Sequence, residues 1–269
     1  IGDALAANLV DRVFEAPERF SSLEVLLGVY GYAFQLYNDF SGYTDVARGS
    51  AKLFGYELPL NFDRPYLAPS LQDFWRRWPI SLSSWLRDYL YIPLGGNRGS
   101  FAKTQRNLFL TMLLGGLWHG AAWTFVVWGA LHGTALAVHR ALGAYEARGR
   151  PPVPRVRDIP RILGTFTFVT ALWVFFRAAT LGDAIAYFRN MATGGLLGAD
   201  PGPWKADLLL VGSIAALVLT MDLIDRRRAV LRPLTRWSPG VQGALLAAAA
   251  IGILVWAGQP PTPFIYFQF

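Results

Sequence analysis

The stretch NLFLTMLLGGLWHGAAWTFVVWGALHGTALAVH, residues 107–139, decides the fold because it contains no Asp, Glu, Lys or Arg. As one helix it would be about 50 Å long, too long for a single crossing of about 30 Å of hydrocarbon without severe tilt. Both flanks are basic, with Arg98, Lys103 and Arg106 before the stretch and Arg140 after it. Basic flanks favour the cytoplasm, so the chain is predicted to enter the membrane and return to the same side.

Glycines mark where this stretch is predicted to break. Gly115-Gly116 and Gly120 are the natural break points, and splitting there gives arms of about 20 Å. The segment Trp118-His119-Gly120 would then lie within the bilayer rather than beyond it. Non-helical backbone at that depth is tolerated only where protein or a water-filled cavity surrounds it. A cavity is therefore predicted at His119.

The chain has three histidines, and all of them lie in this stretch: His119, His132 and His139. An ionisable group at membrane depth is a functional candidate by default, and a neutral imidazole suits a general base that acts on a hydroxyl. For His119 and His132, a hydrogen bond to a neighbouring helix carbonyl is the structural alternative that position alone leaves open. His139 lies next to Arg140, which favours an interfacial histidine.

Composition indicates lipid as the solvent of this chain. Hydrophobic residues make up 53% and charged residues 16% of it, whereas a soluble domain carries about 25% charged residues. The net charge of +7 comes from basic residues clustered between apolar runs, which favours cytoplasmic loops over nucleic-acid binding. The absence of cysteine removes a zinc–thiolate site and an acyl-cysteine intermediate from this segment, and no metal site is predicted.

Three apolar spans are predicted in the second half, over residues 161–176, 204–224 and 241–257. Arginines are dense before the first span and after the second, and sparse in the other connections. This alternation predicts that residues 140–161 and 226–236 are cytoplasmic and that the C-terminus lies outside. The expected fold is all-α: a multi-pass integral membrane protein with re-entrant and interfacial helices.

Residues 72–92 read as one amphipathic helix that lies on the membrane or dips into it. Its apolar face follows helical spacing through Phe74, Trp78, Leu82, Trp85 and Tyr89. Pro79 sits inside this pattern and is expected to kink the helix, because its ring opposes the carbonyl of Trp75.

Two further groups are candidates for binding. Asp39 and Asp45 follow an apolar segment over residues 24–38, and they could orient a histidine, bind a polar acceptor or cap a helix end. Arg76, Arg77 and Arg87 could hold a phosphate or carboxylate of an acyl carrier, or meet anionic lipid.

Several blocks together resemble the membrane-bound O-acyltransferase family, in particular its bacterial branch for alginate O-acetylation. They are FQLYNDFSGYTDVARG (34–49), LPLNFDRPYL (58–67), FWRRWPISLSSWLRDYLYIPLGGNRG (74–99), GGLWHGAAWTFVVWGALHG (115–133) and FIYFQF (264–269). Their order and spacing follow that branch along essentially the whole chain.

This resemblance implies transfer of an acyl group, usually acetyl, to a hydroxyl of an exported polysaccharide or to a periplasmic partner. It also implies that His119 is the central catalytic residue. The family places a second polar residue, most often histidine, where this chain has Pro79, and that departure puts the second group in doubt. No bound cofactor is expected; the donor would be acetyl-CoA or an acyl-carrier thioester, and the location the bacterial inner membrane.

The resemblance further implies that residues 1–269 form one domain, the C-terminal part of a longer protein whose N-terminal helices lie upstream. Two other functions stay open at this stage. One is a different acyltransferase of the same fold, such as a D-alanyl transferase to teichoic acid or an enzyme that acylates a lipid or metabolite. The other is a transporter or pore, which would repeat polar residues along a lining helix, whereas residues 107–139 carry mainly glycine and aromatic residues.

Overall fold

A computed structural model describes residues 2–143, 155–196, 203–225 and 236–257. The chain falls into two compact units, Ile1–Asp207 and Leu208–Phe269. The described residues form helices, turns and loops, which confirms the all-α class for this part of the chain. The single domain expected over residues 1–269 stays a prediction.

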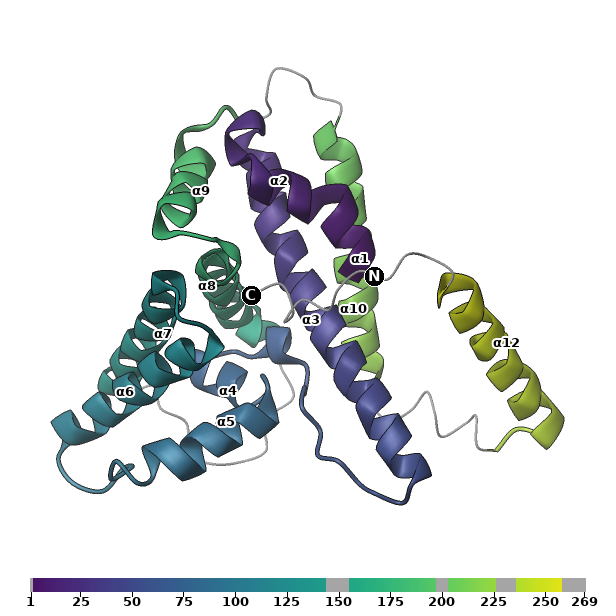
Figure 1. Ribbon diagram of the computed structural model, residues 1–269, viewed down its shortest axis with the longest axis horizontal. Helices are drawn as coiled ribbons and strands as arrows, with labels where there is room; N and C mark the ends of the chain where they lie inside the picture. Colours follow the sequence, from purple (N-terminus) through teal and green to yellow (C-terminus); the bar gives the residue numbers. More distant parts are fainter. Residues whose placement is uncertain (1, 144–154, 197–202, 226–235, 258–269) are drawn as a thin grey trace. The chain divides into compact units, whose positions relative to one another are not determined.

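The helices of the first unit are short up to residue 19, and long helices alternate with short ones from residue 22 onward (Figure 1). In chain order they are α1 (Gly2–Leu5), η1 (Ala6–Val10), α2 (Asp11–Glu15), η2 (Pro17–Arg19), α3 (Ser22–Leu53), η3 (Pro65–Leu67), α4 (Leu71–Trp75), α5 (Ile80–Leu86), η4 (Arg87–Tyr91), α6 (Phe101–His119), α7 (Trp123–Ala141), η5 (Val156–Asp158), α8 (Ile159–Arg177) and α9 (Leu181–Thr193). Then α10 (Pro203–Asp225) leads into the second unit, which also holds α12 (Pro239–Ala257).

Helices α6 and α7 form the hairpin that the uncharged stretch predicts, and they lie side by side in Figure 1. The chain reverses at Gly120, whose backbone is extended, so the predicted reversal is confirmed there. Gly116 does not break the helix but lies against the backbone of Phe125 on α7. A Cβ on Gly129 would stand 2.5 Å from the carbonyl oxygen of Met112. The glycines therefore let the two helix backbones touch, which is the packing that small residues permit in membranes.

Because Gly129 meets backbone atoms that cannot move aside, we expect Gly129→Ala to destabilise the full-length protein by about 1–3 kcal/mol. The apparent melting temperature in detergent measures this. Gly212→Ala on α10 is the matched control, since a Cβ there meets nothing within 4 Å. Replacing that glycine should be neutral or stabilising by up to about 1 kcal/mol. Equal melting temperatures for the two variants would contradict the close packing of α6 and α7.

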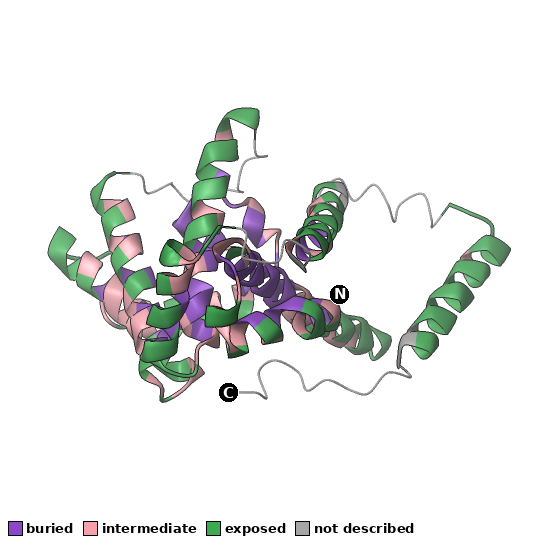
Figure 2. Cartoon of the chain, turned by 90° about the horizontal axis from the view of Figure 1, so that it is seen from above, coloured by how far each residue is buried: buried purple, intermediate pink, exposed green. Residues whose placement is uncertain are grey.

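The three apolar spans predicted in the second half are helices, α8, α10 and α12. Val156–Arg177 and Trp204–Leu223 are long and apolar enough to cross a membrane, and the apolar part of α12, Pro239–Gly252, is shorter. Figure 2 shows burial concentrated in the packed helices of the first unit, and most of the α12 residues whose burial is described are exposed. The order of crossings stays a prediction, and residues 226–235 and 258–269, including the FIYFQF block, lie outside the described residues.

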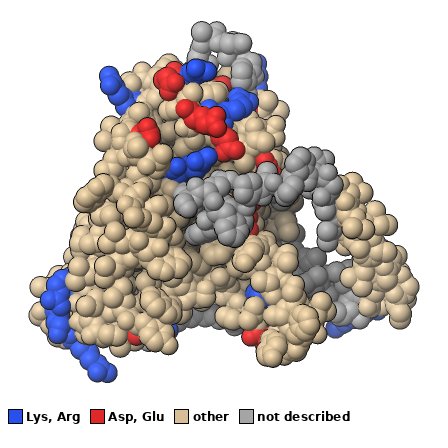
Figure 3. Space-filling view, in the orientation of Figure 1, with Lys and Arg blue, Asp and Glu red and all other residues tan. Residues whose placement is uncertain are grey.

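The surface of the first unit has a broad uncharged region. In Figure 3 it lies on the left of the view, between charged groups near α2 and α9 and basic groups near the start of α6. The first unit also exposes large apolar side chains on α8, for example Leu163 and Phe168. Such a surface suits contact with lipid or with further apolar helices.

The predicted helix over residues 72–92 is wrong as a single element. It ends at Trp75, resumes at Ile80, and continues as the π-helical turn η4. Pro79 is the N-cap of α5 in extended conformation, so it separates two helices rather than kinking one. The break also divides the expected apolar face: Phe74 and Trp78 are buried, whereas Trp85 and Tyr89 are exposed.

The apolar segment over residues 24–38 continues further than expected. Helix α3 begins at a capping box formed by Ser21 and Glu24 and runs without a break to Leu53. Asp39 and Asp45 are therefore inside a helix, and the alternative that either of them caps a helix end is wrong. Helix α3 thereby carries both carboxylates along one continuous element.

Candidate active site

His119 is the last residue of α6, immediately before the reversal at Gly120. Its ring is half-buried among aromatic rings from two other helices. The ring centroids lie 5.4 Å from Trp128 and 6.2 Å from Phe125, both on α7, and 5.0 Å from Phe176 on α8. The predicted position of His119 at the break is thus confirmed, and the predicted cavity around it stays a prediction.

His132 lies on α7 and is fully buried. Trp75 at the end of α4 donates a hydrogen bond from its indole Nε1 to His132 Nδ1, at 3.3 Å. The ring of His132 also packs against Trp128 at 4.8 Å between centroids. The hydrogen bond predicted as the structural alternative for this histidine therefore exists, but its partner is an indole and not a helix carbonyl.

Trp128 connects the two histidines. It is 2% exposed, and its indole contacts His119 on one side and His132 on the other. No role was predicted for Trp128 or Trp75 from the sequence. The spacing of Trp128 and His132, four residues apart on one helix, is a signal that could have placed them on a common face.

The two carboxylates do not join the histidines in this arrangement. The neighbours of Asp39 are Gly2 and Asp3 of α1 and Gln35 of α3 itself. Asp45 is exposed and forms an ion pair with Arg48 one helical turn later, at 3.2 Å.

The three arginines have different surroundings. Arg77 is buried and forms an ion pair of 2.7 Å with Asp73, one turn earlier. Arg87 is about half exposed and pairs with its neighbour Asp88, also at 2.7 Å. Arg76 is half-buried in the turn that follows α4. The fold therefore gives Arg77 a protein partner at i, i+4 spacing, and it buries the pair in the interior.

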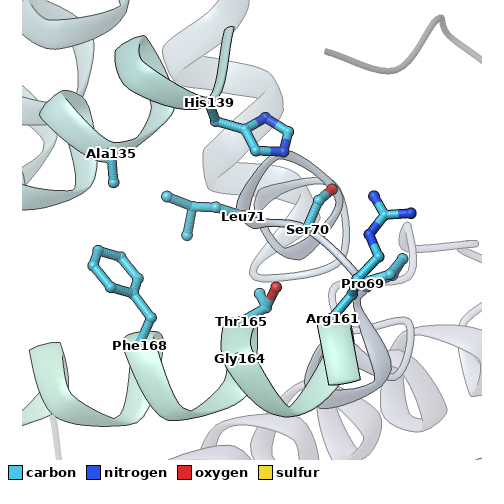
Figure 4. Close-up of a pocket in the computed structure, with 9 residues that line it drawn as sticks. All are labelled: Pro69, Ser70, Leu71, Ala135, His139, Arg161, Gly164, Thr165 and Phe168. Atoms are coloured by element: carbon cyan, nitrogen blue, oxygen red, sulfur yellow. The ribbon is translucent and has the colours of Figure 1, made fainter. Parts of the chain in front are cut away.

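A cavity of about 400 Å³ opens where α8 begins and α7 ends. Figure 4 shows polar side chains gathered on one side of it and apolar side chains on the other. Its walls include Ser70, Leu71, Ala135, His139, Arg161 and Phe168. His119 is not among the lining residues. The cavity approaches the buried histidine instead, because the rings of Phe168 and His132 are 6.1 Å apart.

Together, the described residues define a helical protein with membrane-length helices and a histidine held among aromatic rings where a helical hairpin reverses. Residues 17–181 match the membrane-bound O-acyltransferase family, and the chain belongs to that family. It is a membrane-bound family, which agrees with the apolar helices.

Curated relatives narrow the comparison. The chain is 45% identical over 271 residues to the probable alginate O-acetylase AlgI of Pseudomonas aeruginosa, covering 98% of this chain and 49% of that protein. It is 46% identical over 185 residues to a peptidoglycan O-acetyltransferase of Helicobacter pylori, covering 69% of this chain and 34% of the relative. A teichoic acid D-alanyltransferase of Bacillus subtilis is 32% identical over 152 residues, covering 54% of this chain and 38% of the relative. The chain thus spans about half the length of the first of these relatives.

Proposed function

We propose that the full-length protein is a membrane O-acyltransferase that moves an acetyl group to a hydroxyl of an exported polysaccharide or to a periplasmic partner. The observation that carries this proposal is His119, held among aromatic rings at the reversal of the α6–α7 hairpin in a chain of this family. Acetylation of an exported polymer is favoured because the relatives named for O-acetylation match more of the chain, at higher identity, than the D-alanyltransferase does.

In the proposed reaction the acceptor hydroxyl attacks the carbonyl carbon of an acyl thioester. His119 removes the hydroxyl proton as the new C–O bond forms, and the C–S bond then breaks. The thiolate leaves and takes up a proton, which regenerates the imidazole. General-base assistance of this kind contributes about 10²–10⁴-fold. Positioning and the exclusion of water by the aromatic rings supply more, since water is the competing nucleophile.

The donor is proposed to be acetyl-CoA or an acyl-carrier thioester that arrives from the cytoplasmic side, with no bound cofactor or metal ion. Arg76 and Arg87 are proposed to meet its phosphate groups. Arg77 keeps this role only if its ion pair with Asp73 opens. His132, Asp39 and Asp45 are proposed as supporting residues.

The protein is proposed to lie in a bacterial inner membrane with several crossings. In this arrangement the α6–α7 hairpin enters the membrane from the cytoplasm and returns to the same side. His119, at the reversal, then lies within the bilayer. The basic residues at both ends of the hairpin support this orientation.

D-alanyl transfer to a teichoic acid is the second candidate, because the D-alanyltransferase of Bacillus subtilis is 32% identical to 54% of this chain. The two candidates differ in the group transferred. Chemical analysis of the polymers exported by the source bacterium distinguishes them when the gene for the full-length protein is deleted. We expect loss of ester-linked acetate, restored by complementation, with ester-linked D-alanine unchanged. Retention of acetate with loss of D-alanine would transfer the assignment to the second candidate, and no change in either ester would contradict both.

A further inference from the structure

The hydrogen bond from Trp75 fixes the proton on His132. An indole N–H is only a donor, so Nδ1 of His132 must present its lone pair to Trp75 Nε1. A neutral imidazole with an unprotonated Nδ1 carries its proton on Nε2. His132 Nε2 is buried and meets no hydrogen-bond partner among the described residues. His132 therefore presents a buried N–H donor.

Trp128 presents a second donor, on a ring that contacts the ring of His132. Its indole Nε1 is also buried without a hydrogen-bond partner in the described part of the chain. The two residues are one helical turn apart on α7, and their rings are in contact. A buried donor without an acceptor is unfavourable by about 1–3 kcal/mol, so two of them in contact need an explanation.

We propose that Trp128 Nε1–H and His132 Nε2–H form a donor pair that binds the carbonyl oxygen of the acyl thioester. This inference rests on the proposed function of His119. The pair offers donors only, which matches a carbonyl oxygen because that oxygen accepts hydrogen bonds and donates none. Trp128 also touches the ring of His119, so an oxygen held by Trp128 lies beside the group that activates the hydroxyl.

The donor pair stabilises the charge that develops during transfer. When the hydroxyl oxygen bonds to the carbonyl carbon, the carbonyl oxygen becomes negatively charged and its two hydrogen bonds strengthen. Collapse of this intermediate restores the C=O bond and breaks the C–S bond, and the thiolate departs with a proton. Donors fixed in advance in a site that excludes water are effective because they need no reorganisation during the reaction.

Trp128→Phe in the full-length protein tests the proposal, since phenylalanine keeps an aromatic ring and removes the N–H. We expect kcat for acetyl transfer from acetyl-CoA in membrane vesicles to fall by about 10²-fold, with the KM for acetyl-CoA unchanged. Trp75→Phe is a second variant. It removes the hydrogen bond that keeps the proton of His132 on Nε2, and it leaves the N–H of Trp128 in place. Its kcat should fall as well, by less than that of Trp128→Phe.

Trp78→Phe is the control, because Trp78 is a buried indole of the same aromatic cluster whose ring packs against Phe74 and Trp173. It should lower the melting temperature about as much as Trp128→Phe and leave kcat close to the wild-type value. If kcat is the same for Trp128→Phe and Trp78→Phe, the donor pair is overturned. If transfer persists undiminished in His119→Ala, the general-base role of His119 fails while the donor pair is still judged by Trp128→Phe, so the two failures are distinguishable.

Discussion

Replacing His119 with alanine in the full-length protein is expected to lower acyl transfer by at least about 10²-fold, because the hydroxyl loses its general base. The protein should still insert and accumulate. The ring of His119 lies at a helix end and is half-buried, so its removal leaves the α6–α7 contact at Gly116 and Gly129 in place. The measurement is the ester-linked acyl content of the exported polymer, normalised to the amount of protein in the membrane.

His139→Ala is the matched control for this experiment. It removes the same side chain from the same hairpin, but at the far end of α7, and α7 is about 28 Å long. Acylation by this variant should stay near the wild-type level. Undiminished acylation by His119→Ala would remove the catalytic role from His119, whatever the control shows.

Breaking the ion pair between Asp73 and Arg77 should have the largest effect on stability. The two side chains are 2% and 4% exposed, and Arg77 Nη2 lies 2.7 Å from Asp73 Oδ2. Asp73→Ala leaves a buried guanidinium without its counter-charge, which destabilises by about 3–5 kcal/mol. The apparent melting temperature of the full-length protein in detergent should fall accordingly.

Replacing both partners separates the charge from the packing. Asp73→Leu combined with Arg77→Met removes the unpaired charge and should recover most of the lost stability, since apolar replacements of a buried pair are often neutral. Asp88→Ala is the control, because Asp88 and Arg87 are each 46% exposed and such a pair contributes at most about 1 kcal/mol. A double variant as unstable as Asp73→Ala would show that the pair contributes packing and not charge compensation.

The same double variant also tests the donor-binding role predicted for Arg77. If Arg77 only supports the fold, the double variant with recovered stability should transfer acyl groups with an unchanged KM for the donor. A strong rise in KM, with stability recovered, would return Arg77 to the donor site.

Much of the fold could be predicted from the sequence because it follows from local properties. Long uncharged apolar runs indicated α8, α10 and α12, and basic flanks with a central Gly120 indicated the hairpin. The same uncharged stretch singled out His119. The sequence failed at helix ends: the helix over residues 72–92 is divided at Pro79, and α3 continues through Asp39 and Asp45.

By itself the sequence determined the apolar helices and the histidine at the reversal, since charge and apolarity act over neighbouring residues, and its motif blocks indicated the family. Only the tertiary structure decided which side chains meet. Trp75 is hydrogen-bonded to His132, which lies 57 residues later in the sequence. Asp73 and Arg77 are buried together because α4 packs against other helices. Hydrogen bonds and burial between distant positions depend on the path of the loops and on how helix faces pack, and neither is encoded in the spacing of residues along one segment.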